Sequence, residues 1–449
     1  NKLRKIIIFG GIILSKRTLW KKIGAVIATT CLALAFAGCG GNAPKAADTG
    51  KKITIEYWHI NNENFGLPTV RELIKSFEAE NPNIKVNDKY FNGYMPLMQG
   101  VQAAMASGNP PAVAQIGYNY LDYATKSIPH VTIDEIIARH KDDSTFLSAN
   151  YLPNILELGK LDNKQHGMPY SISNPIVYFN PELFQKAGLD PAKGPKTWAE
   201  VESFSRQIKE KTGAYGVYVQ EPADTWAQQA MMMSNGAKVL VKNGNKATTD
   251  IGEAAAIEAM EQYARMVKEG IALHTGHEEG YQAYISGKTA MLITTIARRA
   301  AVEKNAPFKS SACPFPTYGD KPRHVLAGGN NLFIFAKSTE QQDAAWKFIK
   351  HLQKSENLTA WTKGTGYLPP RKGVAEDPNG LLQMTKENIM LATAIGQLPD
   401  VRPWLSFPGQ NGLQIEQILL DIRDSILTGK MNAQDAMTQG GAKINELLK

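Results

Sequence analysis

Apolar and polar residues of this chain fall into two alternating patterns from Lys52 onward. Short runs alternate apolar and polar residues, as strands with one buried face do, and longer runs repeat apolar residues every three or four positions, as helices do. The patterns predict strands over 52–60, 84–91 and 112–117 and helices over 69–82 and 95–111. Strand–helix–strand alternation favours a largely parallel sheet that is covered by helices on both faces.

The same alternation restarts after Pro175. The apolar run IVYFN (176–180) predicts a strand, and the pattern predicts helices over 181–189 and 197–213. Thr197 followed by Glu200 has the spacing of a capping box at the start of the second helix. Near the end, 341–353 and 413–430 each carry a helical apolar stripe. We therefore expect an α/β protein with two lobes that follow one another.

The formal net charge of +8 is concentrated at the N-terminus. Residues 1–38 hold seven lysines and arginines and no acids, which leaves +8 − 7 = +1 for the remaining chain. A body so close to neutral lacks the basic surface that binding to phosphate backbones requires. We therefore predict no nucleic-acid partner.

Residues 1–38 have the features of a secretory signal segment. The uncharged apolar run over 23–36 follows basic residues and is shorter than the ~20 residues of a membrane-spanning helix. Ala37-Gly38-Cys39 resembles a bacterial lipobox, although Phe36 stands where leucine is usual, and it predicts lipid attachment at Cys39. Residues 39–52 have the composition of a tether, and residues 1–15 fit no signal and are consistent with an over-extended translation start.

Motifs of catalysis and cofactor binding are weak in this sequence. ISGKT (285–289) lacks the first glycine of a nucleotide P-loop, because Gln282 stands in its place, and is interpreted as a turn. HTGHEE (274–279) is interpreted as a solvated loop rather than a metal site, and Cys313 as a buried apolar residue. We predict no cofactor, no metal and no enzymatic activity, although 42 carboxylates leave a glycosidase-like pair open.

Aromatic residues beside polar turns give a more informative signal. Such residues occur throughout the chain: Tyr57, Trp58, Tyr94, Tyr118, Trp226, Tyr367 and Trp404. Sugar rings present apolar C–H faces together with many hydroxyls, so aromatic side chains next to hydrogen-bonding groups suit them. Taken singly, each of these rings is better explained by core packing.

Several stretches, in order and over most of the chain, carry a resemblance to a known family. They are WHINNE (58–63), FEAENPNIKV (77–86), ASGNPPAVAQ (106–115), the run over 168–201, ISGKTAMLIT (285–294), LAGGNNLFIF (326–335) and WTKGTGYLPPRK (361–372). From about Ile53 to the C-terminus the chain resembles the extracellular solute-binding proteins of ABC importers, family 1 type. The similarity is greatest to the branch that binds sugars and glycerol 3-phosphate.

The resemblance implies a two-lobed periplasmic-binding-protein fold of type II, whose lobes are joined by a hinge of three crossings and close around ligand. It places the crossings near Ser171–Pro175, Ser310–Pro314 and Thr365–Pro369, with Gly364 and Gly366 as permissive hinge residues. The implied division gives an N-terminal lobe of 53–170 plus 311–366 and a C-terminal lobe of 171–310 plus 367–449.

Ligand positions carried over from that branch are Tyr94, Tyr118, Ser173, Trp226, Thr295, Gly329, Tyr367 and Glu416. Two of them differ from the glycerol-phosphate binders, which carry an acid in place of Tyr118 and a phosphate-pairing arginine in place of Glu416. A carboxylate at the latter position would repel phosphate, whereas it accepts hydrogen bonds from hydroxyls. The expected ligand is therefore a neutral saccharide or polyol, and Arg298 and Arg299 are a weaker route to phosphate.

The resemblance implies a monomeric substrate-binding lipoprotein that delivers its solute to ABC permease subunits. Its expected location is the cell envelope, lipid-anchored at the outer face of the cytoplasmic membrane or in the periplasm. A binding protein for glycerol 3-phosphate or a glycerophosphodiester remains an alternative, as do a cell-surface carbohydrate-active enzyme and a sensory component that reports ligand to a receptor.

Overall fold

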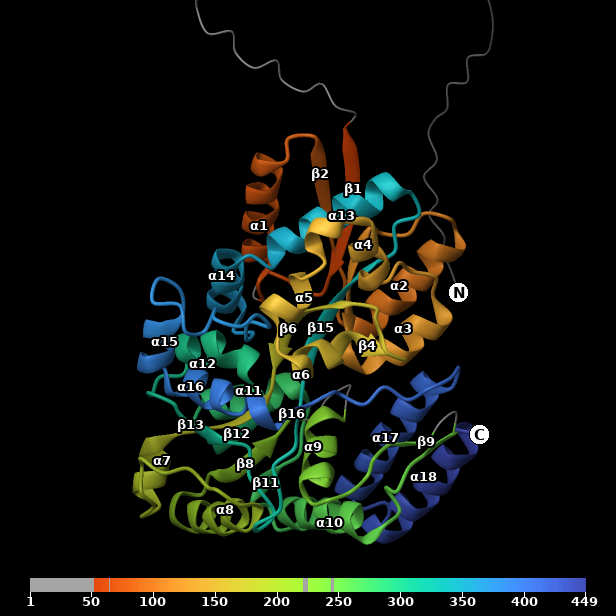
Figure 1. Cartoon of the computed structure of the whole chain (residues 1–449). Coiled ribbons are helices and arrows are strands. Elements are labelled where there is room, and N and C mark those ends of the chain that lie inside the picture. Colours follow the sequence, from red (N-terminus) through yellow and green to blue (C-terminus); the bar gives the residue numbers. More distant parts are fainter. Residues whose placement is uncertain (1–51, 64, 221–224, 244–245) are drawn as a thin grey trace, which may run out of the picture. The chain divides into compact units, whose positions relative to one another are not determined.

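The computed structural model describes residues 52–63, 65–220, 225–243 and 246–449. They belong to one compact unit, Gly50–Lys449 (Figure 1). The predicted signal segment, Cys39 and nearly all of the predicted tether lie outside the described residues. Among the helices that are described, none combines the length and apolar character needed to cross a membrane.

The first of two five-stranded sheets has the order β2-β1-β3-β15-β6. Its strands are β1 (Ile53–His59), β2 (Ile84–Tyr90), β3 (Val113–Gly117), β6 (Met168–Ser173) and β15 (Gly328–Ile334). β1 pairs in parallel with β2 and with β3, whereas β15 is antiparallel to both β3 and β6. The prediction of a largely parallel sheet is therefore wrong for the pairs β3–β15 and β15–β6. The reason is that β15 belongs to a segment that returns from the second sheet in the opposite direction.

The second sheet has the order β11-β8-β12-β7-β13 and repeats this arrangement. Its strands are β7 (Pro175–Phe179), β8 (Tyr215–Val219), β11 (Ala272–Leu273), β12 (Thr289–Thr295) and β13 (Ser311–Pro314). β8 is parallel to β11 and β12, and β7 is antiparallel to β12 and β13. Here too the mixed pairing corrects the expectation of a mostly parallel sheet.

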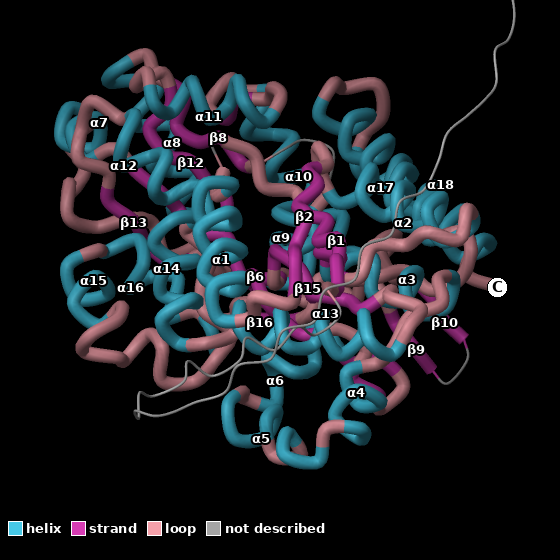
Figure 2. Tube along the Cα trace, turned by 90° about the horizontal axis from the view of Figure 1, so that it is seen from above, coloured by secondary structure: helices cyan, strands magenta, loops and turns pink. Residues whose placement is uncertain are grey.

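Helices surround the strands of both sheets (Figure 2). Around the first sheet they are α1 (Leu67–Glu80), α2 (Tyr94–Ala106), α3 (Leu121–Ser127), α4 (Ile133–Arg139), α5 (Phe146–Asn150), α6 (Pro153–Leu156), α13 (Thr339–Leu352) and α14 (Ser355–Thr365). Around the second they are α7 (Pro181–Lys186), α8 (Trp198–Thr212), α9 (Trp226–Ser234), α10 (Ala254–Lys268), α11 (His277–Ile285), α12 (Arg299–Asn305), α15 (Leu382–Glu387), α16 (Ile389–Gly396), α17 (Gly412–Leu427) and α18 (Ala433–Leu447). Two-residue or three-residue strands complete the fold: β4 (Lys160–Leu161), β5 (Lys164–Gln165), β9 (Val241–Asn243), β10 (Lys246–Thr248), β14 (Val325–Leu326) and β16 (Val401–Arg402).

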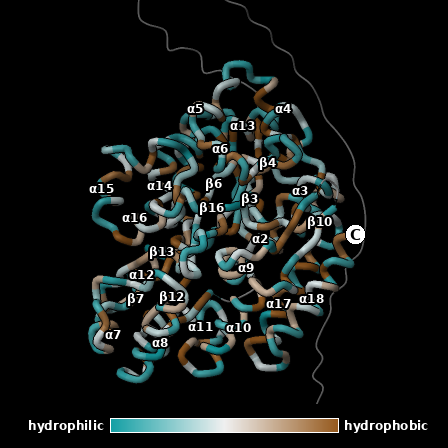
Figure 3. The backbone as a smooth tube through the Cα atoms, turned by 60° about the horizontal axis from the view of Figure 1, so that its bottom comes forward, coloured by the Kyte–Doolittle hydropathy of each residue, from teal (hydrophilic) through white to brown (hydrophobic). Residues whose placement is uncertain are grey.

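The predicted helices form where sequence signals place their ends. Thr197 Oγ1 accepts a hydrogen bond from the amide of Glu200 and the Glu200 carboxylate accepts one from the amide of Thr197, which confirms the capping box of α8. Asn180 caps α7, whose first residue is Pro181. Most of the helices are amphipathic, so their backbone changes between hydrophilic and hydrophobic positions along each helix (Figure 3).

The first passage between the sheets is a single residue, Asn174, between β6 and β7. Its Nδ2 donates to Ala394 O at 2.8 Å, its Oδ1 accepts from Gln397 Nε2 at 3.2 Å, and its backbone oxygen accepts from Ile296 N at 3.1 Å. Asn174 is fully buried, and these bonds satisfy its side-chain and carbonyl groups where the strand leaves one sheet for the other.

Two other segments link the sheets. Ser311–Pro314 is strand β13 of the second sheet, so the chain reaches the first sheet only between Pro314 and Gly328. Leu368 N donates to Ile172 O at 2.7 Å directly after α14. The predicted lobe boundaries and hinge bending remain predictions.

Glycines near the third link have two different roles. Gly366 has φ 81° and ends α14 in the left-handed conformation, as expected of a helix-terminating glycine. Gly364 instead lies inside α14, where a Cβ would approach Thr69 Oγ1 to 2.0 Å. Gly364 is therefore needed for the close packing of α14 on α1, and not for the permissive hinge backbone that was predicted.

Candidate functional site

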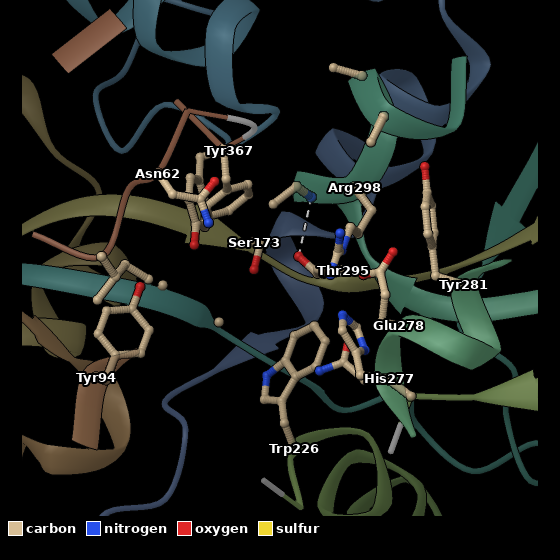
Figure 4. Close-up of a pocket in the computed structure, with 18 of the residues that line it drawn as sticks. Asn62, Tyr94, Ser173, Trp226, His277, Glu278, Tyr281, Thr295, Arg298 and Tyr367 are labelled. Atoms are coloured by element: carbon tan, nitrogen blue, oxygen red, sulfur yellow. Dashed lines mark hydrogen bonds and ion pairs between the residues drawn. The ribbon is translucent and has the colours of Figure 1, made fainter. Parts of the chain in front are cut away.

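A cavity of about 870 Å³ is lined by residues from both sheets and from the segments that link them. The loop after β1 supplies Asn62 and Phe65, the end of β6 supplies Ser173, the segment after α14 supplies Tyr367, and the second sheet supplies Thr295 at the end of β12 (Figure 4). Its volume lies within the range of ordinary small-molecule sites.

Six of the eight predicted ligand residues line this cavity: Tyr94, Ser173, Trp226, Thr295, Gly329 and Tyr367. They come from α2, β6, α9, β12, β15 and the segment after α14. The sequence separates them by up to 273 positions (367 − 94), and the fold brings them to one place. Their contact with a ligand remains a prediction.

Tyr118 and Glu416 are not among the lining residues. Tyr118 is buried, and burial followed by the neighbouring Tyr367 phenol raises its pKa well above the ordinary value. Glu416 lies on α17 with only 7% of its surface exposed, between the buried Ile415 and Ile418. It is therefore not on a solvated helix face, and for both residues a ligand contact stays a prediction.

Tyr94 and Tyr367 stand on the side of the cavity formed by the first sheet. The Tyr94 hydroxyl accepts a hydrogen bond from Asn330 Nδ2 at 3.0 Å. The Tyr367 ring lies parallel to that of Trp361, with centroids 6.3 Å apart, and meets Phe65 edge-on at 5.7 Å. Burial raises the pKa of both phenols, so at neutral pH each hydroxyl keeps its proton and can donate it in a hydrogen bond.

Trp226 and Trp404 form a second aromatic surface of the cavity, and Figure 4 shows Trp226 across from Tyr367. Their ring centroids are 6.3 Å apart at an interplanar angle of 51°. Trp226 Nε1 donates to Leu326 O at 3.1 Å, which fixes the indole at the first residue of α9. Indole faces held in this way suit the apolar C–H faces of a ligand.

The backbone of β15 closes the cavity between these aromatic groups. Gly329 has φ 116°, and a Cβ there would come within 1.9 Å of Ser171 O. A Cβ at Gly328 would reach Ser173 Oγ at 2.5 Å. Two glycines are therefore required for β15 to pass so close to β6 while the Ser173 hydroxyl still lines the cavity.

A further wall, formed by α11 and the turn before α12, was missed by the sequence prediction. HTGHEE was interpreted as a solvated loop, but His277 is the first residue of α11, and His277, Glu278 and Tyr281 line the cavity. Gly276 led to this interpretation, although it stands at the N-cap, just outside α11. Tyr281 follows Glu278 by three residues and His277 by four, and this helical spacing was the signal that would have found the wall.

Arg298 is the cation of this wall. Its guanidinium lies 5.1 Å from the centre of the Tyr281 ring and 3.5 Å from the Glu278 carboxylate. Burial, and then the nearby Arg298 charge, lower the pKa of His277 to about 4, so its imidazole is neutral at pH 7. The lining carries two acids, Glu63 and Glu278, and two bases, Arg298 and Lys304. Glu63 is also paired with Arg71, which does not line the cavity.

The described residues offer no grouping of three or more potential metal ligands. Cys313 is buried in β13, where its thiol donates to Pro195 O, and burial raises its pKa to about 12. The predicted burial of Cys313 is confirmed, and its lack of reactivity stays a prediction. The turn predicted at ISGKT is also confirmed, because Gly287 at φ 72° joins α11 to β12.

Comparisons with known proteins agree with this geometry. Residues 72–388 match the family model described as "Bacterial extracellular solute-binding protein". The sn-glycerol-3-phosphate-binding periplasmic protein UgpB of Escherichia coli K12 is 26% identical over 421 residues, which cover 88% of this chain and 92% of that protein.

Two solved structures show the same fold. UgpB of Mycobacterium tuberculosis in complex with glycerophosphocholine has a TM-score of 0.76 at 23% identity, covering 88% of this chain and 98% of that one. Maltose-bound MalE3 of T. maritima has a TM-score of 0.76 at 19% identity, covering 88% and 100%.

Proposed function

The chain belongs to the bacterial extracellular solute-binding proteins, and from this premise we propose that its cavity captures a neutral saccharide or polyol. Proteins of this family serve ABC importers: they bind a small solute outside the cytoplasmic membrane and deliver it to a membrane permease. The class of ligand is inferred from the residues that line the cavity.

The observation that carries the proposal is the combination of aromatic surfaces with a balanced set of charges. Trp226 and Trp404 lie on one side of the cavity and Tyr94 and Tyr367 on the other. Ser173, Thr295 and amide side chains supply hydrogen-bonding groups between them. A ring with apolar faces and a hydroxyl-rich edge fits such a lining, because stacking and hydrogen bonding are satisfied together.

Charge favours a neutral ligand over a phosphate ester. A site for a doubly charged anion needs an excess of cations or amide donors. Here the two lining acids match the two lining bases, and His277 is neutral at pH 7. A ligand without net charge leaves this balance intact.

Glycerol 3-phosphate or a glycerophosphodiester is the second candidate. The names of the UgpB relatives favour it, and Arg298 and Lys304 are cations that could face a phosphate. Against it stand Glu63 and Glu278 in the same lining.

A thermal-shift screen of the mature protein separates these candidates. A solute present at a hundred times its dissociation constant stabilises the folded protein by about 2.7 kcal/mol. Maltose, D-tagatose, glycerol, glycerol 3-phosphate and glycerophosphocholine represent the classes. We expect a neutral member to raise the melting temperature most; a shift given by the phosphate esters alone would reject the ligand assignment.

Catalysis is not part of the proposed function. A glycosidase would need an acid and a second carboxylate on either side of a scissile bond. Glu63 and Glu278 are the lining carboxylates, and both have an exposed side chain. Incubation with oligosaccharides should leave them intact, whereas released products would favour the enzyme.

We further propose that the mature protein acts as a monomer held at the cell envelope by lipid on Cys39. The Ala37-Gly38-Cys39 sequence after an apolar run supports the anchor. The family supports a location outside the cytoplasm.

A further inference from the structure

The wall made by α11 and the turn before α12 carries a charged pair, Arg298 and Glu278. Neither residue is among the eight predicted ligand residues. Arg298 and Glu278 both line the cavity, with 27% and 59% of their side chains exposed. Figure 4 shows them on the same side as Tyr281 and His277, and across the cavity from Tyr94. The pair is therefore placed where a ligand held by Trp226 and Tyr367 would extend.

Arg298 is held in position by contacts that leave its hydrogen-bond donors available. Its guanidinium lies over the Tyr281 ring, and the Tyr281 hydroxyl accepts from Asn305 Nδ2 at 3.2 Å. Among the described residues no hydrogen bond donated by Arg298 is found, and the Glu278 carboxylate stays at 3.5 Å. An arginine has five N–H donors, so this cation is oriented but not saturated.

The backbone that carries Arg298 is anchored to the link between the sheets. Thr295 Oγ1 accepts from Ala297 N at 3.1 Å, which fixes the turn, and Ile296 N donates to Asn174 O at 3.1 Å. Arg298 follows directly after these residues. Its backbone is therefore fixed next to Thr295, which lines the cavity, and this favours a pre-organised recognition group.

The chemistry of the pair selects its ligand. A guanidinium only donates hydrogen bonds and a carboxylate only accepts them, whereas a hydroxyl does both. Adjacent hydroxyls of one sugar ring can accept from Arg298 and donate to Glu278 at once. A phosphate would be attracted by Arg298 but repelled by Glu278, so the pair as a whole gains little from a net negative charge.

We propose that Arg298 and Glu278 act together as a donor–acceptor pair that binds adjacent hydroxyls of a neutral sugar and selects against anionic ligands. This assignment rests on the proposed function, since it names the recognition groups of the same cavity. Glu278 supplies the selectivity and Arg298 the donor capacity, with Tyr281 as the surface on which the guanidinium rests.

The test is calorimetric titration of wild type, Glu278→Gln and Arg298→Gln with maltose, D-tagatose and glycerol 3-phosphate. Glu279→Gln is the matched control, because it removes the neighbouring carboxylate from the same first turn of α11 but does not line the cavity. Glu278 and Glu279 are both exposed, so neither change threatens folding, and the melting temperature of each variant is measured alongside.

We expect Glu278→Gln to weaken binding of the sugar that wild type prefers by roughly tenfold or more, as loss of a charge-assisted hydrogen bond does. The same change should strengthen glycerol 3-phosphate binding relative to that sugar. Arg298→Gln should weaken both. Glu279→Gln should stay within about twofold of wild type, as surface substitutions do.

Two results overturn the inference and are distinguishable. If wild type binds a sugar and both Glu278→Gln and Arg298→Gln bind it equally well, the pair has no role and the proposed function stands. If wild type binds glycerol 3-phosphate and neither sugar, the inference and the proposed ligand class fail together.

Discussion

Substitution of Gly329 by alanine tests the close approach of β15 to β6, which forms the floor of the cavity. A Cβ at this position would lie 1.9 Å from Ser171 O and 2.7 Å from Ser171 C, both backbone atoms that cannot turn away. The residue also has φ 116°, a conformation that L side chains rarely adopt. Both effects arise where β15 pairs with Ile172 of the edge strand β6.

The magnitude follows from these two costs. Backbone strain contributes about 1–3 kcal/mol, and forced overpacking contributes about 1–3 kcal/mol more. Reduced entropy of the unfolded chain offsets about 0.4–1 kcal/mol of this. The free energy of unfolding should therefore fall by about 1–6 kcal/mol.

Gly270→Ala is the matched control. Gly270 also has a positive φ, 69°, but a Cβ there would meet nothing within 4 Å. It should therefore cost only the left-handed conformation, about 1–2 kcal/mol before the same entropic offset. The difference between the two variants combines the steric overlap of β15 with β6 and the less common backbone conformation of Gly329.

Urea unfolding followed by circular dichroism gives both values, with unchanged slopes as the sign that only stability has changed. Separation of the strands should also displace Ser173, so Gly329→Ala should bind its solute more weakly than Gly270→Ala does. Equal loss of stability in the two variants would refute the claim that the strands lie so close at Gly329.

Three further predictions concern single side chains. Burial raises the pKa of Cys313 to about 12, against an ordinary value of 9.0, so little of its thiol is ionised at pH 8. In a Cys31→Ser/Cys39→Ser background, iodoacetamide should therefore modify the folded protein at pH 8 roughly a thousandfold more slowly than the urea-unfolded protein. Equally fast labelling of both states would contradict this burial. Thr197→Ala removes the cap of α8 and should lower the free energy of unfolding by about 1 kcal/mol, and an unchanged urea midpoint would show that the cap contributes nothing. Cys39→Ala, expressed in a bacterium that processes lipoproteins, should move from the membrane fraction to the soluble fraction, whereas equal membrane retention of variant and wild type would exclude the lipid anchor.

Local sequence signals predicted most of the secondary structure, because the information lies within a few residues. Thr197 and Glu200 mark the start of α8, and Asn81-Pro82 follow α1 directly. The direction of β15 is a different matter. Whether a strand runs parallel or antiparallel depends on the path by which the chain returns, and no short-range pattern in 328–334 records that path.

The candidate site was predicted to the extent that a family resemblance could carry positions across. It gave Tyr94, Trp226 and Tyr367, which line the cavity, and also Glu416, which is buried outside the lining. Arg298 and Glu278 are 20 residues apart on different elements, so only the fold brings them together. The contact between them is made by the tertiary structure, so the hydrophobic periodicity of the sequence could not predict it.

The proposed function is capture of a neutral, hydroxyl-rich solute between the two aromatic surfaces of the cavity. The most direct measurement is side-by-side calorimetric titration of the wild-type mature protein with neutral saccharides and polyols and with glycerol 3-phosphate, at one pH and one salt concentration. We expect saturable binding of a neutral sugar or polyol, with glycerol 3-phosphate bound at least roughly tenfold more weakly, a difference of about 1.4 kcal/mol. Tight binding of glycerol 3-phosphate with no neutral solute to match it would contradict the account.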